Sequence, residues 1–146
     1  MKRTNIEFLI GWLDALRRDD RKTLLASLDP DVVWQGLKPD WVCRGPEEVV
    51  DVFIQHRDPG REVESLEFIG AERHAILHAR GPGVREIEIE LEDGIYNAFA
   101  ISDGRVTRID DFADRAAALS TGESRTGRLG LEAERRRPWK PIASAT

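Results

Sequence analysis

The sequence is poor in residue types that would point directly to a particular chemistry. It contains one cysteine, Cys43, which excludes an internal disulfide and a thiolate metal site and fits a reducing compartment. It has three histidines, and neither His56 nor His78 belongs to a metal-binding motif. We therefore predict a cytoplasmic protein that holds no metal and needs no organic cofactor.

Long apolar runs and a basic surface are also missing. No segment reaches the about 18 consecutive apolar residues of a membrane span, and the N-terminal MKRTNIEF leads into a helical pattern rather than a signal peptide. The main basic cluster is Arg135-Arg136-Arg137, near the C-terminus of a chain with a net charge of -5. An acidic body repels phosphates, so we expect neither a membrane nor a nucleic acid as partner.

The composition, 40% hydrophobic and 34% charged, is typical of one globular domain. Its pattern changes near residue 120. Residues 1–119 form the predicted domain, and residues 120–146 carry glycines, prolines and an excess of basic side chains that interrupt any periodicity. The sequence therefore predicts a flexible basic tail that folding does not require.

Three helices are predicted before residue 60. Thr4 and Glu7 have capping-box spacing at the start of a helix that ends near Arg18, and Asp20 caps a short second helix over 21–28. A short strand follows at 32–35. The sequence Gly45-Pro46-Glu47-Glu48 then places a proline and two acids in the first turn of a third helix, where they are favoured.

The period changes to two after residue 61, which predicts an antiparallel sheet and an α+β fold. The two Asp-Gly pairs, at 93–94 and 103–104, are the residues that two-residue hairpins prefer. The predicted strands are 62–70, 73–79, 84–92, 95–101 and 105–112.

These hairpins predict which residues share a face of the sheet. A two-residue turn at 103–104 pairs Tyr96 with Asp111, and the turn at 93–94 pairs Leu91 with Tyr96. Asp111 and Tyr96 then face inward with Ile109. The outer face receives Asp110 with four apolar residues, Phe99, Ile101, Val106 and Phe112. One β-bulge would exchange Asp110 and Asp111.

Two stretches make the chain resemble the nuclear transport factor 2-like superfamily, in particular its SnoaL-like (polyketide cyclase-like) branch. They are W-x-x-x-G-P-E-E, from Trp41, and DGRVTRIDDFADRAAAL, from Asp103 to Leu119. The resemblance covers residues 4–119. It implies an α+β barrel or cone, in which a curved antiparallel sheet and three N-terminal helices surround an apolar pocket. It also implies a homodimer through the outer sheet face, for which Phe99, Ile101 and Val106 are the candidates.

The enzymes of this superfamily imply different roles for the residues of this chain. The catalytic aspartate of ketosteroid isomerases falls on Gly36, and their first-helix tyrosine has no counterpart, so that isomerase mechanism is not expected. The last-strand acid of limonene epoxide hydrolases corresponds to Asp111. Their Arg-x-Asp pair on an earlier strand is missing here, and the nearest matching stretch of this chain offers His78 instead. SnoaL-like cyclases are similar in using a pocket acid and a histidine, here Asp111 with His78 or His56.

The resulting hypothesis is a protein that binds a compact, largely apolar small molecule and has Asp111 as general acid or base. Poor solvation would let a buried carboxyl carry a proton near neutral pH. Tyr96 and His78 complete the predicted catalytic set, whose reaction would be cyclase-, isomerase- or hydrolase-like. The predicted ligand-binding residues are Trp34, Trp41, Phe53, His56, Phe68 and Ile109.

Two alternatives stay open. Asp111 would have a purely structural role if its carboxylate only accepted a hydrogen bond from Tyr96. The domain would be a non-catalytic binding module, or a dimeric scaffold, if the side chains of Trp34, Trp41 and Phe53 filled the pocket.

Overall fold

Three helices precede most of the sheet, as the sequence predicts. The computed structural model describes residues 4–56, 64–71, 73–81, 84, 89 and 91–122, and the backbone of 132–136; of His56 and Gly122 it describes only the backbone. Helix α1, Asn5–Arg17, has the predicted capping box between Thr4 and Glu7. Helix α2, Arg21–Ala26, is capped by Asp20, and α3 spans Pro46–His56. A fourth helix, α4, spans Arg115–Gly122 after the last hairpin.

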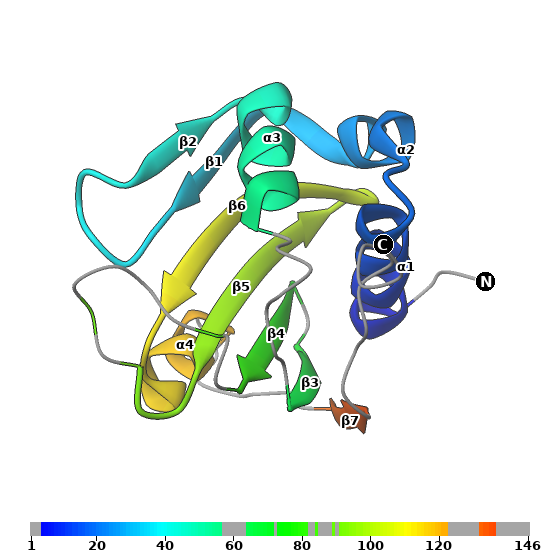
Figure 1. The fold of residues 1–146 in the computed structure, drawn as a ribbon. Coiled ribbons are helices and arrows are strands. Elements are labelled where there is room, and N and C mark those ends of the chain that lie inside the picture. The colour runs from blue at the N-terminus through cyan, green and yellow to red at the C-terminus, as the bar shows by residue number, and fades with distance from the viewer. Residues whose placement is uncertain are drawn as a thin grey trace.

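The sheet has seven strands in the order β2-β1-β6-β5-β4-β3-β7 (Figure 1). The α+β class is confirmed, but the sheet is mixed rather than antiparallel, because β1 runs parallel to β6. Its edge strands are β2 and β7, so within the described residues it is an open sheet and not a closed barrel. The strands are β1 Leu28–Gln35, β2 Val42–Arg44, β3 Ser65–Gly70, β4 His74–Arg80, β5 Ile95–Ser102, β6 Arg105–Phe112 and β7 Glu132–Arg136.

Each face of the sheet has its own apolar cluster. The inner face packs against α1 and α3 through the larger cluster, which contains Leu9, Trp12, Phe53 and Phe99. The outer face packs against α4 through a smaller cluster that contains Tyr96 and Ala118. A side chain in the middle of the sheet is therefore covered on either face.

The hairpin at Asp103-Gly104 confirms the predicted turn but not the register that follows from it. Both residues have positive φ angles, 52° and 74°, and Ser102 lies opposite Arg105. A β-bulge then intervenes, because Ile101 pairs with Val106 whereas Ala100 pairs with Arg108. Beyond the bulge, Asn97 rather than Tyr96 lies opposite Asp111.

Strand β5 also has a different neighbour from the predicted one. Tyr96 pairs with His78 on β4 and not with Leu91. The other edge of β5 is occupied by β6, so no edge is left for the predicted strand 84–92. Most of that segment lies outside the described residues. Gly94 makes the close pairing possible, because a Cβ there would lie 2.0 Å from the carbonyl oxygen of Ala79.

The bulge changes which side chains are available to a partner. Phe99 and Val106, predicted on the outer face as a dimer contact, are fully buried in the inner-face core. The third residue of that patch, Ile101, is partly buried against the same core. The predicted dimer interface is therefore wrong in its residues, and Phe99 has a structural role within one chain.

Five residues of the predicted tail form a strand. Strand β7 pairs antiparallel with β3, from Leu66 opposite Arg136 to Gly70 opposite Glu132. The sequence predicts no strand there, because the segment EAERR lacks an apolar alternation. Trp139 and Ile142 lie outside the described residues. In the part of the chain that the structure describes, no helix is long and apolar enough to cross a membrane.

Candidate functional site

Asp111 lies on the inner face, near the C-terminal end of β6. Its side chain shares that face with Asn97, its cross-strand partner on β5. Strand β1 places Trp34 opposite Ile109, two residues before Asp111. Asp111 is partly buried. The predicted inward orientation is thus found, although the neighbours of Asp111 differ from the predicted ones.

Two nitrogen donors hold the same oxygen of Asp111. The indole Nε1 of Trp34 donates to Oδ1 over 2.8 Å, and Nδ2 of Asn97 donates to it over 2.6 Å. Both donors are on side chains that are 7% exposed. Hydrogen bonds from N–H groups stabilise the ionised form of a carboxyl, so the arrangement favours a carboxylate. The orientation of Asp111 is fixed by side chains from two different strands.

Aromatic side chains extend from Asp111 to α1. The ring of Trp34 stacks on Phe53 of α3, with centroids 4.0 Å apart and planes at 15°. Trp12 of α1 meets Phe53 edge-on at 5.0 Å and Phe99 at 5.4 Å. We call Trp34, Phe53 and Trp12 the aromatic row. It forms a buried apolar cluster that begins beside the carboxylate.

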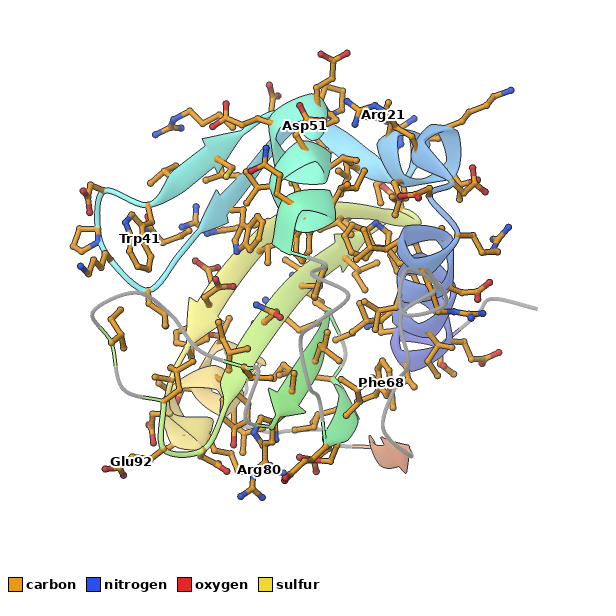
Figure 2. All side chains as sticks on the ribbon, in the orientation of Figure 1. Arg21, Trp41, Asp51, Phe68, Arg80 and Glu92 are labelled. Carbon is orange, nitrogen blue, oxygen red and sulfur yellow. The ribbon has the colours of Figure 1, made fainter. Side chains whose placement is uncertain are left out.

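The other predicted ligand-binding residues are dispersed. Ile109 is fully buried on the inner face, and Phe68 is buried in the same core on β3. Trp41 lies in the β1–β2 loop, where the Nζ of Lys38 is 5.0 Å from its ring centroid. Figure 2 shows Trp41 and Phe68 on opposite sides of the molecule. Trp41 and Phe68 are therefore not parts of one group, and the side chain of His56 lies outside the described atoms.

Two of the predicted catalytic residues lie on the other face of the sheet. Tyr96 and His78 stack on each other at 3.9 Å, with planes at 3°. The hydroxyl of Tyr96 donates to Oδ2 of Asp93 over 2.5 Å, not to Asp111. The structure therefore does not form the predicted group of Asp111, Tyr96 and His78, and it excludes the structural pairing of Asp111 with Tyr96. The β-bulge is the physical reason.

Tyr96 and His78 belong to a polar network beneath α4, which we call the outer network. The ring nitrogens of His78 lie 3.2 Å from Oε1 of Glu67 and 2.5 Å from the carbonyl oxygen of Asp93. Arg115 donates to both oxygens of Glu67, over 2.7 and 3.2 Å. This fork is the geometry that Arg prefers with carboxylates, and it joins α4 to β3.

Burial raises the pKa of Tyr96 to about 12, with a further contribution from its hydrogen bond to Asp93 and an opposing one from Arg115. The pKa of Arg115 is also raised, chiefly by its hydrogen bond to Glu67. Both groups therefore keep their protons at neutral pH, which suits donors in a structural network better than a proton carrier.

The thiol of Cys43, the single cysteine, is also protonated at neutral pH. Partial burial raises the pKa of Cys43, and the nearby acids Glu48 and Asp111 add to this. Among the described residues no group of three or more His, Cys, Asp or Glu side chains could hold a metal ion.

At Gly36, the position of the isomerase aspartate, a Cβ would lie 2.9 Å from the Cβ of Trp41, so the loop has no room for a side chain.

Asn97 is the residue of this site that the sequence reasoning missed. Strict alternation places it on the outer face, and only the bulge brings it beside Asp111. A signal was present in the spacing of two apolar residues. Val106 and Ile109 are both buried in the inner-face core, yet three positions separate them, which a regular strand cannot accommodate on one face.

Comparison with solved structures identifies the fold. A protein from Sinorhizobium meliloti assigned as a polyketide cyclase has a TM-score of 0.52 and 19% identity, over 73% of this chain and 94% of that one. An LEH-like epoxide hydrolase from M. tuberculosis has a TM-score of 0.51 and 21% identity, over 81% of this chain and 84% of that one. A nuclear transport factor 2-like protein of unknown function from Cytophaga hutchinsonii has a TM-score of 0.56 and 12% identity, over 82% of this chain and 97% of that one.

These similarities define the class of protein at the level of its fold. The chain has the nuclear transport factor 2-like fold, in which polyketide cyclase SnoaL-like proteins are also found. No protein-family model and no curated protein sequence matches the chain. Because one fold of this kind serves several chemistries, the activity has to be argued from the site.

Proposed function

We propose that the protein binds a compact, largely apolar small molecule on the inner face of the sheet and uses Asp111 as a general base. The observation that carries this proposal is the Asp111 carboxylate, held by Trp34 and Asn97 at one end of the aromatic row. A mainly apolar surface with one oriented polar group is what a binding site for such a molecule requires.

The role of base follows from the two donors. The two N–H donors keep the carboxyl in the charged form that accepts a proton and fix its direction. Because they also lower its basicity, Asp111 would act as a base through its position beside the substrate. The substrate would carry a carbonyl group. Asp111 would remove a proton from the carbon next to that carbonyl, and the proton would return to another position or be replaced from water. This is the first step of a cofactor-independent isomerase or cyclase.

The structural neighbours support this class without deciding within it. Their printed descriptions include a polyketide cyclase and an epoxide hydrolase. The former fits proton removal beside a carbonyl, whereas the latter would require a water molecule as the group that Asp111 activates. We favour the former because the indole of Trp34, which binds Asp111, belongs to a row of aromatic rings that suits a flat substrate.

A second function is favoured by the packing itself. Trp34, Phe53 and Trp12 contact one another directly and are at most 9% exposed. Side chains that fill the inner face in this way are expected of a scaffold domain without a ligand, in which Asp111 would only orient Trp34 and Asn97. Trp41, which the sequence predicts among the side chains that fill the pocket, lies in the β1–β2 loop.

One experiment separates the two functions without knowledge of the natural substrate. The bicyclic ketone 1-tetralone is the probe, and NMR in D₂O follows both its binding and the exchange of its protons next to the carbonyl. A general base should accelerate that exchange. Asp111→Asn keeps the shape but removes the base, so the exchange rate should fall by about 100-fold or more while binding is largely retained.

The matched control is Asp110→Asn. Asp110 is the adjacent residue on the opposite face, where its carboxylate binds Nε of Arg108 at 2.9 Å. This variant should exchange 1-tetralone at the native rate. A scaffold would neither bind the probe nor accelerate exchange. Equal rates for the two variants and the native protein would reject Asp111 as base.

A homodimer and a cytoplasmic location complete the proposal. Both are carried over from the sequence, the first from the resemblance and the second from the single cysteine. The buried positions of Phe99 and Val106 mean that a dimer would use a different surface from the one predicted.

A further inference from the structure

One buried donor in the core has no acceptor. Among the described residues, the indole Nε1 of Trp12 is the buried side-chain polar atom without a hydrogen-bond partner. The side chain is only 3% exposed. Folded proteins pair nearly all such groups, because an unpaired buried donor destabilises the fold. The exception therefore requires an explanation in terms of this chain.

Trp12 lies in the apolar cluster that begins beside the proposed base. Its ring meets Phe53, which stacks on Trp34, and Trp34 donates its own N–H to Asp111. The aromatic row thus has an indole donor on each outer member. One of them is paired with the carboxylate, and the other, on α1, is unpaired.

We propose that the indole N–H of Trp12 donates a hydrogen bond to a neutral oxygen of the small molecule that binds on the inner face, such as a ketone oxygen. This inference rests on the proposed function. A single N–H in an apolar cluster cannot replace the solvation of an anion, so a neutral acceptor is the class that it suits. Nε1 is covered by protein atoms, so the molecule reaches it by moving the side chains above it.

Trp12 and Asp111 together place two requirements on the ligand. Asp111 requires a group that gives up a proton or donates a hydrogen bond, and Trp12 requires an acceptor. The body between them has to be apolar, because the rings of Phe53 and Phe99 contact Trp12. Ketones and enolisable bicyclic molecules fulfil these conditions.

The test compares two probes that differ by one carbonyl oxygen, 1-tetralone and tetralin. The native protein should bind 1-tetralone about 2- to 12-fold more tightly, which corresponds to one net hydrogen bond. Trp12→Phe should abolish that preference. A protein with β-(3-benzothienyl)alanine at position 12, which keeps the bicyclic shape without the N–H, should behave in the same way even if the smaller phenylalanine disturbs the packing.

The control is Trp41→Phe, which removes an indole from the β1–β2 loop and should leave the preference intact. The direct readout is the indole ¹⁵N–¹H signal of Trp12, one of four tryptophan signals, identified by its loss in Trp12→Phe. It should move downfield with 1-tetralone and hardly at all with tetralin. A Trp12 proton that already contacts a buried water in the absence of probe would overturn the inference.

The remaining outcomes separate this inference from the proposed function. If 1-tetralone shifts the Trp34 signal and exchanges its protons, but leaves Trp12 unchanged, the base is supported and the donor role of Trp12 is rejected. If neither probe binds, both proposals are rejected. If both probes bind equally well, the inner face binds apolar molecules and Trp12 does not select their oxygen.

Discussion

Asp111 and its neighbour Asp110 show how strongly one backbone irregularity determines the chemistry of a residue. Asp111 is held by Trp34 and Asn97 on the inner face, whereas Asp110 pairs with Arg108 at the outer surface. Both are aspartates of the same strand. Only their position relative to the bulge makes one a candidate base and the other a surface ion pair.

Tyr96 is the residue whose ionisation tests the outer network. It is the only tyrosine of the chain, so tyrosinate absorbance near 295 nm reports this side chain alone. The pKa of about 12 lies above the ordinary value of 10.0 because burial penalises the anion. We expect a midpoint well above 10 in the folded protein and near 10 in urea.

The sign of the resulting pH dependence follows from the same shift. Between pH 10 and about 12 the folded state keeps the Tyr96 proton that the unfolded state loses. The stabilisation is therefore complete below pH 10 and is lost as the pH rises toward 12. A folded-state midpoint at 10 would contradict the buried hydroxyl. Tyr96→Phe, which cannot ionise, is the control for base-induced unfolding.

At the scale of elements, an ion pair joins α4 to β3. Arg115 binds Glu67 of β3 with two hydrogen bonds, and the Glu67 side chain is 7% exposed. Arg115→Ala removes two charge-assisted hydrogen bonds to a buried carboxylate, so the free energy of unfolding should fall by about 1–3 kcal/mol in urea denaturation. The surface variant Arg17→Ala, which removes an exposed pair with Asp14, should cost less than about 1 kcal/mol. Equal losses of unfolding free energy in the two variants would show that the Arg115–Glu67 pair contributes no more than an exposed ion pair.

The elements differ in how far the sequence determines them. Helices α1 and α3 begin where Thr4 and Pro46 predict, because capping is decided by residues within one turn. The bulge in β6 is not marked by a glycine, and it satisfies the burial of Val106 and Ile109 on one face. The prediction has Tyr96 rather than Phe99 on the inner face of β5, and the bulge reverses β6 relative to β5. The two errors cancel for Asp111, which lies on the predicted inner face, but they leave its partner Asn97 unidentified.

Pairing between distant strands was the hardest part to predict. Consecutive strands suggested hairpins, yet β5 pairs with β4, β1 pairs with β6, and β7 closes the far edge of the sheet. Local alternation carries no information about which edge a strand joins, because any strand offers two. The contact of Tyr96 with Asp111 fails for a different reason, the bulge, and His78 pairs with Tyr96 on the other face, where the two side chains meet Glu67 and Asp93.

At the scale of the whole molecule, β7 links the C-terminal region to the domain. The sequence predicts a dispensable tail, but the pairing of β7 covers the edge of β3. Truncation after Gly122 should therefore lower the melting temperature by more than about 4 °C and increase self-association through the exposed edge. Removal of residues 137–146 alone keeps β7 and should have little effect. Differential scanning fluorimetry and light scattering measure both. An unchanged melting temperature would show that the domain is complete at residue 122.

The parallel pairing of β1 with β6 has a consequence for how the protein is made. Trp34 and Asp111, which form one of the two hydrogen bonds of the site, are separated by 77 positions in the chain. During synthesis from the N-terminus, Trp34 leaves the ribosome long before the residue that it binds. The helices that begin the chain are complete early, whereas the carboxylate arrives with the last strand of the domain core. A nascent chain that stops short of β6 thus carries the whole aromatic row but no base, and the site is acquired only when β6 has been made.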